Sequence, residues 1–171
     1  KVRRDGALDE ARGVEVFLEL ADALTHAHGE KVLHRDLKPQ NVILDALNKD
    51  RPMITDFGLA KLQGEDLNLT QDGPTLIGTP GFMPPEQAGT GIPIDHRADI
   101  YSLAATLYFA LTGKPPFKAP SLPAVLNLVV HEAPQAPSQI ISGFSHDLET
   151  IVLKCLLKRP DDRYSSASEL K

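Results

Sequence analysis

The polar octamer His-Arg-Asp-Leu-Lys-Pro-Gln-Asn at residues 34–41 holds three side chains suited to phosphate chemistry: Asp36, Lys38 and Asn41. Phosphoryl transfer needs little covalent help, so a protein that catalyses it mainly positions the reactants and neutralises charge. A carboxylate can accept or orient the proton of an attacking hydroxyl, an ammonium can neutralise phosphoryl oxygens, and an amide oxygen can bind Mg²⁺. The octamer therefore indicates a loop for phosphoryl transfer; a polar turn is the alternative interpretation.

A second candidate group is Asp56, which opens the tripeptide Asp-Phe-Gly after a short apolar run. A carboxylate at the end of a strand suits a hard, oxygen-binding cation such as Mg²⁺. Phe57 would anchor the turn in the core, and Gly58 would let the backbone change direction. Asp-Phe-Gly alone occurs readily in turns, so its weight comes from following the octamer along the chain.

The segments that must position these groups are predicted to be mainly helical, with a few short β hairpins. Apolar residues at three-and-four spacing predict a helix over residues 9–28, with Asp9 as N-cap and Gly29 as its stop. Short β-rich runs are predicted at residues 31–34, 41–45 and 52–55.

The second half of the chain carries the other predicted helices. They cover residues 97–112, 122–132 and 145–158, and Ser166 with Glu169 forms a capping box at the start of another. Between the two halves, residues 56–94 show little periodicity, and a stretch of that length is usually functional or disordered.

Composition narrows the function classes. The chain has 171 residues and a formal net charge of −5 without a basic patch, which argues against a nucleic-acid partner. The single cysteine, Cys155, excludes a disulfide framework and fits an intracellular compartment, and it is expected to be a small core residue. No signal peptide opens the sequence and no apolar run is long enough to span a bilayer, so we expect a cytoplasmic chain without a membrane segment.

Five motifs then occur in the order found in one known family: the octamer, Asp-Phe-Gly, "GTPGFMPPEQ", "DHRADIYSL" and "KRPDDRY". The sequence resembles a eukaryotic-type (Hanks-type) Ser/Thr protein kinase, specifically its large C-terminal lobe. The residues within its motifs are similar to those of bacterial members. The resemblance implies a kinase C-lobe over residues 1–171. Within it lie a catalytic loop at 34–41, an activation segment at 56–86 and a helical subdomain at 95–171.

The resemblance also implies ATP and Mg²⁺ as cofactors and assigns roles to matching residues. Asp36 would be the catalytic base, Lys38 a contact of the γ-phosphate, and Asn41 and Asp56 the Mg²⁺ ligands. These last three residues and Ile43, which would lie under the adenine ring, form the expected nucleotide site. For Ile43, packing in a core strand is a compatible alternative.

Other matching residues are expected to regulate the lobe or to bind substrate. Arg35, next to Asp36, resembles an arginine that binds a phosphorylated activation segment. Thr70 and Thr75 are the candidate phosphate acceptors, while Thr79 would belong to the loop that faces the protein substrate. Each threonine could equally be an ordinary polar loop residue.

A last group is expected to be structural. His34 and Phe57 would stack between the two loops, and Asp99 would accept backbone hydrogen bonds from the catalytic loop. Glu86 would pair with Arg163 to anchor the activation segment. Pro84 and Ala104 depart from the usual residues of the family, but neither removes a chemical group.

The sequence contains neither a G-x-G-x-x-G loop nor a V-A-I-K-like strand, the elements with which the family's small lobe holds ATP. Under the resemblance, that lobe is expected in cis outside these residues, the partner is a protein with a Ser or Thr acceptor, and this chain alone is expected to be inactive. The alternatives are a pseudokinase-like scaffold that docks partners and a phosphotransferase for small molecules. The long activation segment disfavours the last.

Overall fold

The computed structural model describes residues 7–57 and 80–171. Over these residues the fold is mainly helical, as the sequence predicts. Helices α1 (Glu10–Gly29), α2 (Arg97–Thr112), α3 (Leu122–His131) and α4 (His146–Cys155) are joined by loops that contain short 3₁₀ turns. None of the helices in the described part of the chain combines the length and apolar character needed to cross a bilayer.

The strands β1 (Val42–Asp45) and β2 (Arg51–Ile54) form one antiparallel hairpin, in which Ile43 is opposite Met53. The strand predicted at residues 31–34 is absent, so that prediction was wrong. The reason is that the backbone N–H of His34 donates to the side chain of Asp99 rather than to a neighbouring strand.

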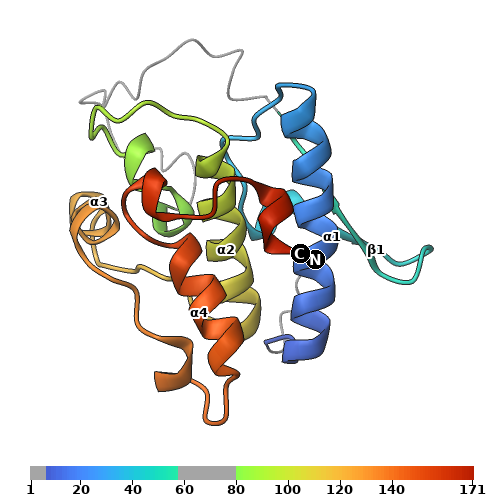
Figure 1. Ribbon diagram of the computed structural model, residues 1–171. Helices are drawn as coiled ribbons and strands as arrows, with labels where there is room; N and C mark the ends of the chain where they lie inside the picture. The colour runs from blue at the N-terminus through green and yellow to red at the C-terminus, as the bar shows by residue number, and fades with distance from the viewer. Residues whose placement is uncertain (1–6, 58–79) are drawn as a thin grey trace.

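Helix α2 is the centre of the fold, and Figure 1 shows it between α1 and α4. All but one of its residues from Ala98 to Leu111 are buried, so it has no solvent-facing side over that stretch. Burying a Leu or Ile side chain contributes about 1.5–3 kcal/mol to stability, which makes α2 the support for the rest of the structure. It ends at Gly113, whose φ of 71° closes the helix in the left-handed conformation that glycine adopts without strain.

Local signals set several helix ends. The Asp9 carboxylate accepts the Arg12 N–H at 2.8 Å, as predicted for the start of α1. The predicted capping box is displaced by one residue, because Ser165 rather than Ser166 binds the Glu169 carboxylate, through both its N–H and its hydroxyl. The cysteine of α4, Cys155, is buried, and burial raises the pKa of its thiol to about 12, as suits a core residue.

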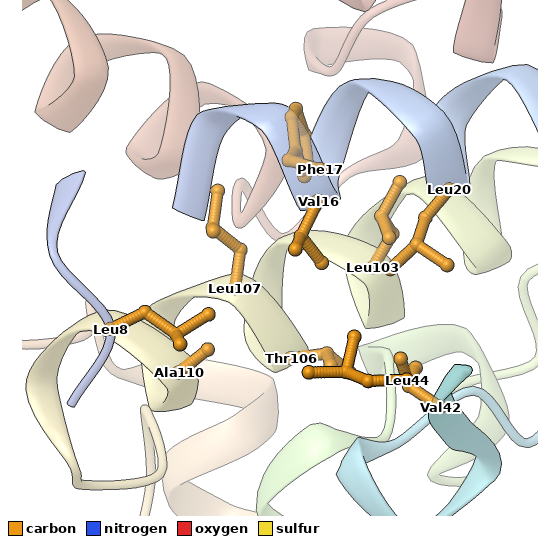
Figure 2. A pocket seen from close by; sticks show the side chains of 10 residues that line it. All are labelled: Leu8, Val16, Phe17, Leu20, Val42, Leu44, Leu103, Thr106, Leu107 and Ala110. Atoms are coloured by element: carbon orange, nitrogen blue, oxygen red, sulfur yellow. The ribbon is translucent and has the colours of Figure 1, made fainter. Parts of the chain in front are cut away.

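The β hairpin is attached to the helices by apolar packing. Figure 2 shows the pocket where side chains of β1 meet those of α1 and α2. Its volume is about 30 Å³. Its one polar lining residue is Thr106, whose hydroxyl already donates to the Ser102 carbonyl at 2.8 Å. An apolar site without free polar partners does not bind water, so this joint is a dry contact that fixes the strand following residues 34–41. The lining residues are Leu8, Val16, Phe17, Leu20, Val42, Leu44, Leu103, Thr106, Leu107 and Ala110.

Candidate active site

Three polar side chains converge within the loop that connects α1 to β1. The Lys38 ammonium donates to the Asp36 carboxylate at 2.6 Å. The Asn41 amide nitrogen donates to the backbone carbonyl of Asp36 at 2.7 Å and lies 3.4 Å from its carboxylate. Asp36, Lys38 and Asn41 therefore form one cluster.

The cluster is open to solvent on its carboxylate side. The Asp36 side chain is 49% exposed, whereas the Lys38 side chain, at 19%, lies mostly against the protein. Asn41 is buried, and because its amide nitrogen is bound to Asp36, its amide oxygen is the atom left to bind a cation. A reactant can thus reach the Asp36 carboxylate, while the side chains of Lys38 and Asn41 lie mostly against the protein.

Asp56 is brought to this loop through its neighbour Thr55. Both the N–H and the hydroxyl of Thr55 donate to the Asn41 carbonyl, at 2.9 and 3.3 Å. Asp56 follows with an exposed side chain and a φ of 63°, a left-handed backbone that is uncommon outside glycine. The end of β2 and the end of the octamer are therefore tied together, and Asp56 is the first residue past the tie.

His34 joins the two loops from inside. Its side chain is buried, its Nε2 lies 2.8 Å from the Thr55 carbonyl, and its ring packs edge-on against Phe57 with a centroid distance of 4.9 Å. The Nδ1 accepts the Asp36 N–H at 3.2 Å, so the ring proton belongs on Nε2, where it is donated to Thr55. The His34 ring thus links the backbones that carry Asp36 and Asp56.

Asp99, on the buried helix α2, holds the start of the octamer. Its carboxylate accepts the N–H of His34 at 2.9 Å and that of Arg35 at 2.8 Å. A further contact, with His28 Nε2 at 2.8 Å, was not predicted, although the helical spacing in α1 does put His28 on its inward face. Asp99 is 1% exposed, so these bonds compensate for its burial.

Arg35 has two unusual features. Its φ is 67°, and its backbone carbonyl accepts a hydrogen bond from the side chain of Gln87 at 2.7 Å, a residue that sequence reasoning did not single out. Its guanidinium Nε is buried and has no hydrogen-bond partner among residues 7–57 and 80–171. Buried donors normally have partners, so this nitrogen is a candidate to receive an acceptor group.

Glu86 and Arg163 form a buried bidentate ion pair. The guanidinium nitrogens donate to the two carboxylate oxygens at 2.7 and 2.8 Å, and both side chains are 0% exposed. Arg163 also donates to the backbone carbonyls of Leu157, Arg97 and Lys158. The 3₁₀ turn Pro85–Gln87 is thereby fixed to the C-terminal part of the fold.

The Arg163 guanidinium lies over the ring of Tyr101, whose buried hydroxyl has no hydrogen-bond partner in the described part of the chain. Burial raises the pKa of this phenol, so it stays neutral. An unsatisfied buried hydroxyl costs about 1–3 kcal/mol, and Tyr101→Phe is therefore expected to raise the free energy of unfolding by about 1 kcal/mol. Tyr108→Phe is the matched control, because the Tyr108 hydroxyl donates to the Gln135 carbonyl at 2.8 Å and its loss should be destabilising. Denaturant midpoints that fall equally for both variants would contradict this explanation.

Ile43 lies on β1 with 43% of its surface exposed, opposite Met53, which is 44% exposed. The interpretation of Ile43 as a buried core residue is therefore wrong, and the pair forms a small apolar patch on the hairpin. The other predicted residues, Thr70, Thr75 and Thr79, lie outside the described residues.

In the described part of the chain, no group of three or more His, Cys, Asp or Glu side chains is placed to hold a metal ion. A site made of Asn41 and Asp56 would not form such a group. Mg²⁺ is often bound by one or two protein oxygens, with phosphates and water completing the octahedron.

Comparison with known proteins agrees with this arrangement. The family model described as "Protein kinase domain" matches residues 1–171. The chain is 39% identical over 170 residues to the serine/threonine-protein kinase PknB of Mycobacterium leprae, covering 99% of this chain and 27% of that protein. It is 40% identical over 162 residues to the serine/threonine-protein kinase Pkn1 of Myxococcus xanthus, covering 92% of this chain and 23% of that protein. The chain thus spans about a quarter of the length of these relatives.

Proposed function

Because the chain belongs to the protein kinase domain family, we propose that it is the large lobe of a Ser/Thr protein kinase and carries the residues that transfer the γ-phosphate of ATP to a protein hydroxyl. The observation that carries this proposal is the cluster of Asp36, Lys38 and Asn41, whose groups match the three needs of the reaction. In this proposal residues 34–41 are the catalytic loop, 56–86 the activation segment and 95–171 the helical subdomain.

Asp36 acts as the base in this mechanism. Its half-exposed carboxylate orients the serine or threonine hydroxyl of the substrate and accepts its proton as the oxygen bonds to the γ-phosphorus and the bond from that phosphorus to ADP breaks. Lys38, already 2.6 Å from that carboxylate, neutralises charge on the phosphoryl oxygens in transfer. Asn41 and Thr55 fix the backbone on either side, so the groups need little reorganisation.

The donor set also fits Mg²⁺. The free amide oxygen of Asn41 and the exposed carboxylate of Asp56 are hard oxygen ligands on two backbones that are hydrogen-bonded to each other. The ion would supply neutralisation of the phosphate charge. Ile43 and Met53, exposed side by side on the hairpin, offer an apolar surface for the adenine ring.

Phosphate contacts that the family takes from a glycine-rich loop and a strand lysine have no counterpart in these residues. We therefore propose that the 171-residue chain alone has negligible activity and that the contacts come from a small lobe in cis. Well-oriented binding supplies about 7–11 kcal/mol to such reactions, which is the contribution the isolated chain lacks.

Regulation by phosphorylation is a further part of the proposal. The buried Nε of Arg35 lacks a partner among the described residues, and a phosphate on Thr70 or Thr75 would supply acceptor oxygens and about −1.5 to −2 charges. The substrate-facing role of Thr79 remains a prediction from the family resemblance.

The test uses the purified full-length protein that contains this chain. It is incubated with Mg²⁺, labelled ATP and a protein substrate that contains Ser or Thr, and transfer of the label to the substrate is measured. Asp56→Asn should reduce transfer by about 10²–10³-fold, because a ligand for the charge-neutralising ion is weakened. Asp147→Asn, an exposed carboxylate in the first turn of α4, is the control and should be neutral. Absence of transfer by the wild-type protein would favour the scaffold alternative.

A further inference from the structure

Gln87 makes a hydrogen bond to the loop of residues 34–41 that the roles proposed above for other residues do not explain. It ends the 3₁₀ turn Pro85–Gln87, and its amide nitrogen donates to the Arg35 carbonyl at 2.7 Å, across 52 residues of sequence. The neighbouring residue Glu86 is fixed by its buried pair with Arg163. The Gln87 side chain therefore reaches the catalytic loop from a rigid base.

The carbonyl that Gln87 binds belongs to the peptide unit immediately before Asp36. The opposite side of that unit, the Asp36 N–H, donates to His34 Nδ1 at 3.2 Å. The preceding N–H, of Arg35, donates to Asp99 at 2.8 Å. The N–H and the carbonyl of Arg35 and the N–H of Asp36 are thus each bound by a side chain.

These bonds hold the backbone in a conformation that is not its lowest in energy. Arg35 has a φ of 67°, and a non-glycine residue keeps this left-handed conformation only where its surroundings impose it. Releasing the Arg35 carbonyl would let the peptide rotate toward the ordinary region. Because the Cα of Asp36 is attached to that peptide, the rotation would swing its carboxylate away from Lys38.

We propose that Gln87 is a positioning residue for phosphoryl transfer: by donating to the Arg35 carbonyl, it orients the peptide that carries Asp36 and couples the end of the activation segment to the catalytic loop. This inference rests on the proposed role of Asp36 as the base. It assigns no contact between Gln87 and either substrate.

The proposed role requires that residue 87 carry an N–H donor long enough to reach the Arg35 carbonyl. Variants can separate this requirement from the effects of side-chain size and polarity. Gln87→Glu keeps the shape but has no N–H and places a carboxylate against a carbonyl, while Gln87→Met keeps the length without polarity. Gln87→His places a ring N–H at a similar reach and is largely neutral at pH 8. Gln139→Glu is the matched control, since Gln139 ends the corresponding Pro-x-Gln turn Pro137–Gln139 with an exposed side chain.

The first measurement is steady-state kinetics of the full-length protein at pH 8. Gln87→Glu and Gln87→Met are expected to lower kcat by about 10–100-fold with the KM for ATP changed less than about threefold, because small misplacement of a reacting group costs up to about 10² in rate. Gln87→His should recover most of kcat, and Gln139→Glu should match wild type. A rise in the KM for ATP at constant kcat, or no recovery with histidine, would overturn the positioning role.

The second measurement needs no catalysis. Amide hydrogen exchange at residues 34–36 should accelerate by about fivefold or more in Gln87→Glu, with the amides of α4 unchanged, since one bond to a local segment is lost. Unchanged exchange at residues 34–36 overturns the inference even if activity falls. If wild-type protein transfers no phosphate, the proposed function fails, whereas the exchange result still decides whether Gln87 holds the loop.

Discussion

Under the proposed function, replacing Asp36 by asparagine is expected to lower kcat of the full-length protein by about 10²–10⁴-fold, the usual contribution of a general base. Asparagine keeps the size of the side chain but cannot accept the substrate proton. The loop should stay in place, because the bonds that hold it use the Asp36 backbone, with Asn41 bound to its carbonyl and His34 to its N–H. The measurement is steady-state transfer from ATP to a protein substrate, accompanied by thermal unfolding.

Two outcomes would separate chemistry from folding in this experiment. The half-exposed carboxylate contributes little to the core, so the unfolding temperature of Asp36→Asn should stay within a few degrees of wild type. Asp45→Asn is a control in the same region and should keep its activity, because the Asp45 carboxylate accepts the Leu47 N–H in the hairpin turn and no other hydrogen bond from residues 7–57 and 80–171. Retention of more than about a tenth of the wild-type kcat by Asp36→Asn would reject the base role.

Separating Glu86 from Arg163 is expected to cost about 3–5 kcal/mol of unfolding free energy, because either partner alone is left as a buried charge. Proteins of this kind have about 5–15 kcal/mol in total, so Glu86→Ala and Arg163→Met should each be severe. The double variant should be less destabilised than the sum of the two singles, since it leaves no unpaired charge. Denaturant unfolding of the kinase domain measures all three.

The control for this prediction is a surface pair on the same part of the fold. Asp161 binds Arg97 at 2.8 Å, but its side chain is 69% exposed. Asp161→Ala should therefore change the unfolding free energy by less than about 1 kcal/mol. Equal costs for Asp161→Ala and Glu86→Ala would show that burial does not govern the Glu86–Arg163 pair.

The parts of the structure that residue pattern predicts well without the family resemblance are those decided by near neighbours. The Asp9 cap, the end of the helix predicted at residues 97–112 and the cluster of Asp36, Lys38 and Asn41 all depend on residues within a few positions of one another. Helix propensity, capping and short loops act over that range, so periodicity and motif spacing were sufficient.

The predictions that failed concern segments whose backbone groups bind side chains from outside the predicted element. Helix α4 was predicted to reach Lys158 but ends at Cys155, and the carbonyls of Leu157 and Lys158 instead accept hydrogen bonds from Arg163. Residues 31–34 are apolar enough for a strand, yet the N–H of His34 belongs to Asp99, 65 residues away.

Functional partners were missed for the same reason. His28 binds Asp99 across 71 residues, and Gln87 binds the Arg35 carbonyl across 52 residues. No motif in the sequence indicates either of these contacts. A histidine on the inward face of α1 was the available signal for the first of them. For Gln87, only the folded arrangement of the turn Pro85–Gln87 identifies the acceptor.

The position of Asp99 has a consequence for how variants of this protein are classified. The carboxylate that binds the backbone of residues 34–35 belongs to α2, which is almost fully buried, so the packing around α2 sets the position of this loop. A methyl group removed from Leu103 or Leu107 would shift that helix and, with it, the backbone of Asp36. In a screen that scores turnover alone, such core substitutions would be grouped with losses of the carboxylate that we propose as the base, although they would touch no reactant.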